Sequence, residues 1–296
     1  MFDKILGNDK IKFELINSIK SGKYSHSYLF LGISGIGKKM IAREFAKMIL
    51  CDGEEKYCNK CKSCLEFDSN NNPDFIEIVP DGKNVKIEQI REMQRKIVEQ
   101  PIISTKKVYI IDDADTMTRE AQNCLLKTLE EPPEFANIIL IGSNESSFLS
   151  TIKSRCTIIK FNPISDEQVK GYIKEKYELP EISESIILAS SGSIGKAEIL
   201  KDKQELFSSI DKVINNIEQM DLIDTLKNAD IIYKSQEDKQ DILEYINIIL
   251  FKKAKQNQKY LNCINIVEDT KKRLRANSNY NMTIDNMIMT IWEEIH

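Results

Sequence analysis

A glycine-rich loop near the N-terminus limits the folds open to this chain more than any other part of the sequence. Residues 32–38 read Gly-Ile-Ser-Gly-Ile-Gly-Lys and match the phosphate-binding pattern G-x-x-x-x-G-K. The apolar run 28–31 predicts a buried strand before the loop, and apolar residues at helical spacing over 40–50 predict a helix after it. This order predicts a P-loop domain, in which backbone N–H groups at the helix N-terminus cradle phosphates and Lys38 reaches them. The glycines of the pattern are Gly32, Gly35 and Gly37.

The residue after the loop lysine departs from what an ATP site with magnesium requires. A Ser or Thr hydroxyl holds Mg²⁺ at this position in P-loop enzymes, whereas this chain has Lys39. An ammonium group cannot ligate the metal ion and repels it. The loop therefore indicates P-loop ancestry, while ATP hydrolysis, and ATP with Mg²⁺ as a cofactor, are doubtful for this chain.

Acidic and polar residues follow two of the expected strands. Asp112 and Asp113 come directly after the third apolar run, where Asp112 would hold a metal ion and Asp113 would take the general-base position that is usually a Glu. The same aspartates could also cap the next helix. Asn144 ends the fourth run and could orient an attacking water, with a turn-forming Asn as an equal alternative.

The remaining apolar runs predict the rest of the architecture. Four more runs alternate with helical patterns, which predicts a parallel sheet covered by helices on both faces: 75–79, 108–111, 138–141 and 157–161. After Pro163 the strands stop, and short helices broken at Pro180 and 190–195 give way to a helical pattern over 205–296. We therefore expect an α/β domain, a small helical lid domain and an all-α C-terminal domain. Their predicted bounds are 1–162, 163–205 and 206–296.

Four cysteines lie close together in a polar segment after the first predicted helix, with the spacing C-x6-C-x2-C-x2-C. Short C-x2-C spacing lets thiolates converge on one tetrahedral ion, and four thiolates close its coordination shell. The pattern predicts a structural Zn²⁺ site in a module spanning 51–64, and four free thiols are the alternative. The predicted ligands are Cys51, Cys58, Cys61 and Cys64.

Charge and hydropathy exclude some function classes. The net charge of −4 argues against binding nucleic acid over the whole surface, which requires a basic face, although a local basic patch stays possible. No secretory signal and no apolar run of membrane-spanning length are visible. We therefore expect a cytoplasmic protein without membrane partners, in which cysteines are thiols or metal ligands rather than disulfides.

Several further motifs resemble those of bacterial DNA polymerase clamp-loader subunits of the AAA+ superfamily. The segment 123–133 is similar to the family pattern N-x-L-L-K-x-L-E-E-P-P, and Ser154-Arg155-Cys156 matches its S-R-C motif. The acidic box at 108–115 and the position of the cysteines also resemble the family. Lys196 lies where the lid of such proteins carries a sensor arginine. The resemblance is strong over about residues 1–200, and beyond them it rests on position and helicity alone.

Within that family the chain resembles the delta-prime type of the DNA polymerase III clamp loader more than the ATP-hydrolysing gamma/tau type. Lys39, Asp113 and Lys196 depart from the motor pattern, whereas Arg155 is retained. Taken alone, Arg155 would be read as a surface arginine. The resemblance implies instead an arginine finger that completes the ATP site of a neighbouring motor subunit, while this chain's own site is inactive.

The resemblance also implies partners. They are gamma/tau and delta subunits in a hetero-pentamer that loads a sliding clamp onto primer-template DNA during replication. An active gamma/tau-type ATPase is the first alternative. A zinc-stapled regulator that binds nucleic acid and keeps a relic P-loop is the second, and the acidic composition argues against it.

Overall fold

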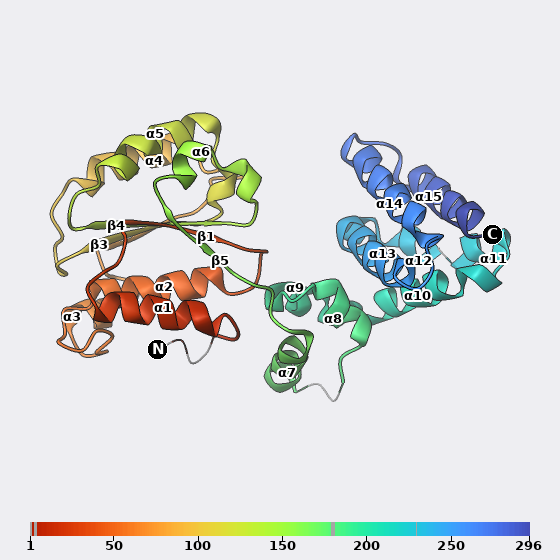
Figure 1. Ribbon diagram of the computed structural model, residues 1–296, viewed down its shortest axis with the longest axis horizontal. Coiled ribbons are helices and arrows are strands. Elements are labelled where there is room, and N and C mark those ends of the chain that lie inside the picture. The colour runs from red at the N-terminus through yellow and green to blue at the C-terminus, as the bar shows by residue number, and fades with distance from the viewer. Residues whose placement is uncertain (1, 3–4, 179–180, 229) are drawn as a thin grey trace. The chain divides into compact units, whose positions relative to one another are not determined.

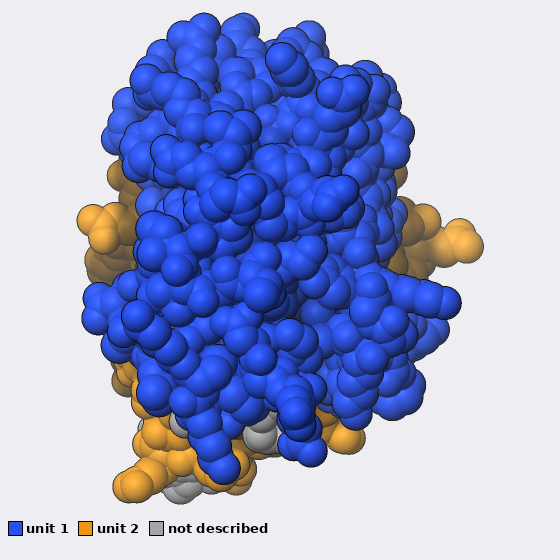
Figure 2. All heavy atoms as spheres, turned by 90° about the vertical axis from the view of Figure 1, so that its left-hand side faces the viewer, with its two compact units in different colours: residues 1–165 blue, residues 166–296 orange. Residues whose placement is uncertain are grey.

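The chain forms two compact units, Met1–Ser165 and Asp166–His296, which Figure 2 colours blue and orange. The computed structural model describes residues 2, 5–178, 181–228 and 230–296 of the 296. The helix break predicted at Pro180 lies outside the described residues. The further division of the second unit into lid and C-terminal domains stays a prediction.

Unit 1 is built on a five-stranded parallel sheet, as the alternating apolar runs predict. The strand order is β2-β3-β4-β1-β5, so β4 is the central strand and β1 lies between β4 and β5. In register, Leu29 of β1 faces Leu140 of β4 and Ile158 of β5. The strands are β1 Ser27–Leu31, β2 Phe75–Ile78, β3 Lys107–Ile111, β4 Ala136–Gly142 and β5 Thr157–Lys160.

Helices cover both faces of this sheet (Figure 1). Alternate residues of each strand point to opposite faces, so apolar side chains from the strands form a separate core on each side. Phe30 and Ile139 belong to the core beneath α1 and α2, whereas Leu29 and Leu140 belong to the core beneath α4 and α5. The helices of unit 1 are α1 Asp9–Lys20, α2 Lys38–Leu50, α3 Lys62–Asp68, α4 Ile87–Ile97, η1 Ala114–Thr116, α5 Arg119–Glu130, η2 Glu145–Ser147 and α6 Ser150–Lys153.

Two of the helices longer than a single turn, α1 and α3, are absent from the sequence prediction. α1 places Ile11, Leu15 and Ile19 on one buried face, a spacing that the sequence carries ahead of the first strand. α3 has only seven residues inside a polar segment, too few for a periodic pattern. Its start is set by Cys61, whose thiol accepts a hydrogen bond from the N–H of Cys64.

Unit 2 contains only helices among its described residues, as predicted for the chain beyond the last strand. Ser191 and Gly192 adopt left-handed backbone angles and separate α8 from α9, where a break is expected. None of the helices in the described ranges combines the length and apolar character needed to cross a bilayer. The elements are α7 Asp166–Tyr177, α8 Glu184–Ser190, α9 Ile194–Leu200, η3 Lys201–Lys203, α10 Gln204–Asn216, η4 Ile217–Gln219, α11 Leu222–Asn228, α12 Asp230–Lys234, η5 Gln236–Asp238, α13 Lys239–Ala254, α14 Tyr260–Arg275 and α15 Tyr280–Ile295.

Candidate functional site

The glycine-rich loop lies at the carboxyl edge of the sheet, between the end of β1 and the start of α2. Gly35 and Gly37 have φ angles of 77° and 89°, which residues other than glycine rarely adopt. A Cβ on Gly32 would lie 2.8 Å from the Ile36 side chain and 3.0 Å from Phe161. The backbone of the loop therefore requires glycine at the positions where the phosphate-binding pattern has it.

Lys38 is bound to the loop itself. Its ammonium group donates hydrogen bonds to the carbonyl oxygens of Gly32 at 2.7 Å and Ile33 at 2.8 Å. The side chain is buried, and burial lowers the pKa of Lys38, while nearby aspartates, Asp115 first among them, act in the opposite direction. Lys38 is thus placed for a phosphate and is meanwhile satisfied by backbone acceptors.

Lys39 is bound to two carboxylates of this chain. Its ammonium group forms an ion pair with Glu77 of β2 and lies 3.0 Å from Asp112 Oδ2 at the end of β3. Burial lowers the pKa of Lys39, but hydrogen bonds to Glu77 and Asp112 outweigh it, so the net shift is upward. Lys39 therefore carries a positive charge beside the carboxylate that the sequence assigns to a metal ion.

Glu77 is a site residue that sequence reasoning missed. Its second oxygen accepts a hydrogen bond at 2.7 Å from Arg43, one turn along α2 from Lys39. The signal was present in the sequence, because a carboxylate in the apolar run Phe-Ile-Glu-Ile-Val requires a partner once the strand is covered. Which cation would reach it could not be read from the sequence.

The acidic residues after β3 have separate environments. Asp113 has a left-handed φ of 44°, and burial, followed by the charges of Asp112 and Asp115, raises its pKa. Asp115 accepts hydrogen bonds from the backbone N–H groups of Ser143 at 3.1 Å and Asn144 at 2.9 Å. It thereby ties the end of β4 to the turn after β3.

Asn144 lies directly after β4, as expected. Its side-chain oxygen accepts hydrogen bonds from the backbone N–H of Ser146 at 3.0 Å and from the Ser146 hydroxyl at 2.7 Å. This is the turn-forming arrangement that the sequence left open beside a water-orienting role.

Arg155 lies between α6 and β5, on the surface of unit 1. One guanidinium nitrogen donates to the carbonyl oxygen of Thr151 at 2.9 Å, and another pairs with Glu130, the first glutamate of the E-E-P-P motif. The Arg155 side chain is 32% exposed and that of Glu130 is 48% exposed. The arginine is therefore partly exposed, and it pairs with a carboxylate that is about half exposed.

Lys196 lies in unit 2, in the first turn of α9. The Ser193 hydroxyl caps this helix by accepting a hydrogen bond from the Lys196 N–H at 3.0 Å. The Lys196 ammonium group lies 3.1 Å from Asp241 and 2.5 Å from Glu244, both on α13. The residue at the expected sensor position is thus paired within its own unit, and no sequence pattern on α13 indicated this.

The four predicted metal ligands converge. All four sulfur atoms lie within 4.8 Å of one another, and Cys51 Sγ is 3.6 Å from Cys58 Sγ. A tetrahedral zinc site with Zn–S distances of ~2.3 Å places its sulfurs ~3.8 Å apart, so the cluster fits such an ion. Backbone N–H groups of Lys60 and Cys61 lower the pKa of Cys58 to about 6, which favours the thiolate that a metal requires.

The cysteine module packs on α2, the helix that follows the phosphate loop. Lys47 of α2 donates to Asn59 at 2.6 Å and forms an ion pair with Asp68 of α3 at 2.6 Å. Arg43, which binds Glu77, also donates to Asn70 at 2.6 Å. The module and the residues that follow it are therefore bound to α2 by side-chain contacts.

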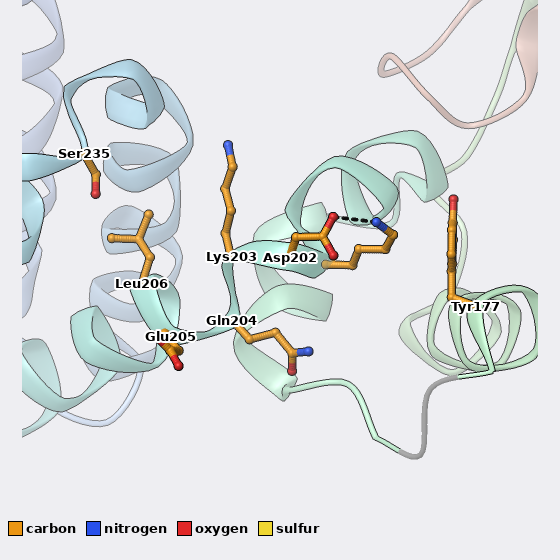
Figure 3. A pocket seen from close by; sticks show the side chains of 8 residues that line it. Tyr177, Asp202, Lys203, Gln204, Glu205, Leu206 and Ser235 are labelled. Carbon is orange, nitrogen blue, oxygen red and sulfur yellow. Dashed lines mark hydrogen bonds and ion pairs between the residues drawn. The ribbon is translucent and has the colours of Figure 1, made fainter.

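A hollow of about 720 Å³ in unit 2 contains none of the predicted site residues. Its lining comes from the end of α7, from η3 and the start of α10, and from Ser235. In Figure 3 the labelled side chains point in different directions and do not converge on one point. The hollow therefore presents no catalytic arrangement.

Comparison with known proteins identifies relatives for most of the chain. The family model described as "DNA polymerase III, delta subunit" matches residues 7–165. Subunit delta' of DNA polymerase III from Bacillus subtilis is 35% identical over 201 residues, which cover 68% of this chain and 61% of the relative. Subunit tau/gamma from Haemophilus influenzae is 30% identical over 252 residues, covering 82% of this chain and 36% of the relative. The chain thus spans less than two thirds of these relatives' own length.

Among solved structures, a DNA polymerase III gamma subunit-related protein from Thermotoga maritima has the same fold. The TM-score is 0.50 at 21% identity, and the match covers 95% of this chain and 99% of the other. This likeness shows the same fold, an α/β unit followed by a helical unit.

Proposed function

The chain belongs to the bacterial DNA polymerase III clamp-loader family, and from that premise we propose that it is a delta-prime-type subunit. In this proposal its own ATP site is inactive, and it supplies Arg155 to the ATP site of a neighbouring motor subunit. The observation that carries the proposal is the contrast in pairing. Lys39 is held by two carboxylates that are less than one-fifth exposed, whereas Arg155 pairs with a carboxylate that is about half exposed.

The proposed partners follow from this role. Gamma/tau and delta subunits would assemble with the chain in a cytoplasmic hetero-pentamer, which would load a sliding clamp onto primer-template DNA. Contacts with clamp and DNA would be made through the complex. Zn²⁺, one per chain, is the proposed structural ion of the four-cysteine cluster, and metal analysis of reduced protein prepared without chelators tests it.

The decisive experiment is Arg155→Ala in a reconstituted clamp loader. The phosphate-loop lysine should be replaced in every motor subunit except the one beside this chain. Hydrolysis is then measured only at the ATP site that Arg155 would complete. Arginine fingers are worth roughly 10³–10⁵ in rate, so clamp-stimulated hydrolysis at that site should fall by about 10³ or more. Arg119→Ala, at an exposed arginine at the start of α5, is the matched control and should leave the rate unchanged.

Two outcomes would count against the proposal. Unchanged hydrolysis in the Arg155→Ala complex would remove the arginine-finger role. Steady ATP hydrolysis by the purified chain alone, abolished by Lys38→Ala, would favour the gamma/tau-type alternative. The left-handed glycines of the loop and the gamma/tau relatives are the observations on that side.

A further inference from the structure

We propose that the Lys39 ammonium group is a built-in cation that closes a latent divalent-metal site formed by Glu77 and Asp112. The inference deepens the proposed function, because it states what occupies the metal position of the inactive site. Glu77 extends the site to β2, beyond the residues that the phosphate-loop pattern indicates.

The first observation is that all four carboxylate oxygens are engaged by donors of this chain. Glu77 Oε1 pairs with Lys39, and Glu77 Oε2 accepts from Arg43 at 2.7 Å. Asp112 Oδ2 lies 3.0 Å from the Lys39 ammonium group, and Asp112 Oδ1 accepts from the Asp113 N–H at 3.1 Å. A metal ion would have to displace at least one of these donors to coordinate either carboxylate.

The second observation is the burial of the pair. The Glu77 and Asp112 side chains are only 19% and 18% exposed, so two like charges share a partly desolvated edge of the sheet. Such a pair requires a cation between its members. Lys39, in the first turn of α2, supplies that cation from a tethered position.

Charge explains why a metal ion would not join the occupied site. Lys39 and Arg43 already pair with Glu77 and Asp112, so a divalent ion would lie beside an ammonium group that repels it. Replacing Lys39 by Thr leaves a net charge of −1 among the remaining three groups. It also places a hydroxyl at the position where P-loop proteins use one to hold Mg²⁺. Two carboxylates and a hydroxyl are hard oxygen ligands of the kind that Mg²⁺ and Mn²⁺ prefer.

The closed site also has a structural consequence. Lys39 joins the first turn of α2 to β2 and β3, and Arg43 extends the connection to Asn70 beside α3. The loop edge is therefore held together by groups of this chain, without a bound nucleotide. A variant that lacks the ammonium group should be less stable in the absence of divalent ions and should recover stability when they are added.

The experiment is a Mn²⁺ titration of the isolated full chain, saturated with Zn²⁺ beforehand and followed by the electron paramagnetic resonance of free Mn²⁺. The wild-type chain should bind Mn²⁺ only weakly. Lys39→Thr should bind one Mn²⁺ on the order of 30-fold more tightly than the wild-type chain does. This factor corresponds to the repulsion between a single and a double positive charge about 4 Å apart in water. Adding Asp112→Asn to Lys39→Thr should abolish the gain.

Two further variants control for charge and folding. Lys39→Arg keeps the cation and should remain without Mn²⁺ binding. Lys86→Met removes a surface lysine that pairs with Asp81 elsewhere in unit 1, and it should behave as wild type. Thermal unfolding with and without MgCl₂ provides a second readout. Magnesium should raise the melting temperature of Lys39→Thr and not that of Lys39→Arg.

The inference is overturned if Lys39→Thr folds and gains no Mn²⁺ site. It is also overturned if the wild-type chain already binds Mn²⁺ as tightly as the variant through Asp112. If Lys39→Thr folds neither with nor without MgCl₂, Lys39→Met takes its place. A Mn²⁺ site in Lys39→Met that is lost when Asp112→Asn is added supports the inference. The absence of such a site in Lys39→Met overturns it. These measurements use the chain without partners, so their failure is distinguishable from failure of the Arg155 experiment in the reconstituted complex.

Discussion

The phosphate-loop site and the Ser154-Arg155-Cys156 segment both present cations, but they hold them in different ways. At the loop, Lys39 has two carboxylate partners that are less than one-fifth exposed, and one of these also binds Arg43. At the segment, Arg155 has a single carboxylate partner, Glu130, that is about half exposed. Exposed pairs contribute roughly 0–1 kcal/mol, so a stronger anion can displace Glu130. The comparison teaches that the two basic residues differ in how firmly their carboxylate partners hold them.

The largest effect that would sharpen this contrast is expected from metal removal, because the cysteine module is bound to α2, the helix that follows the phosphate loop. Structural Zn²⁺ contributes about 10–16 kcal/mol in isolated zinc-finger peptides. We expect Cys61→Ser to raise amide hydrogen exchange over 51–72 by roughly 10³-fold, which corresponds to about 4 kcal/mol of that stabilisation. Segment 150–160 should keep its protection, and hydrogen-exchange mass spectrometry measures both.

Cys124→Ser, at a half-buried cysteine of α5 outside the cluster, is the control. It should leave exchange over 51–72 unchanged. Equal loss of protection at 51–72 and 150–160 in Cys61→Ser would break the comparison, because the two regions would then unfold together.

The sequence predicts the parts of this contrast that depend on residues close together along the chain. Strands, loop and the α2 helix follow from apolar runs and glycine spacing, and the four cysteines converge because their spacing allows little else. The pairings cannot be predicted in this way, because they join residues that are distant along the chain. Lys39 meets Glu77 only because the sheet order places β2 beside β3, and Lys196 meets Glu244 only through helix packing in unit 2.

A smaller effect is expected at the arginine segment. If Glu130 competes with phosphate for the guanidinium group, Glu130→Gln should raise turnover at the neighbouring ATP site by up to about fivefold, the equivalent of 1 kcal/mol. Single-turnover hydrolysis in the reconstituted complex measures it. Glu131→Gln, the adjacent exposed glutamate, is the matched control. A marked decrease with Glu130→Gln alone would instead make Glu130 a group that positions the arginine.

The smallest effect concerns Asp113, at the position of a general base. Burial and the charges of Asp112 and Asp115 raise its pKa, so the folded chain disfavours the ionised form. The resulting penalty is present above the raised pKa and disappears as pH falls through it, because the carboxyl is then protonated in the folded state. Asp113→Asn should therefore stabilise unit 1 near neutral pH, and the gain should shrink in acid.

Because Asp113 is largely exposed, solvent screening limits this gain to a few tenths of a kcal/mol, about 1 °C in melting temperature. Asn also tolerates the left-handed φ of 44°. Asp115→Asn, the same change two residues later, should destabilise instead, since Asp115 binds two backbone N–H groups. A complex containing Asp113→Asn should hydrolyse ATP at the wild-type rate. A large loss of hydrolysis would mean that this chain's own site performs chemistry, and the distinction between its two basic regions would fail.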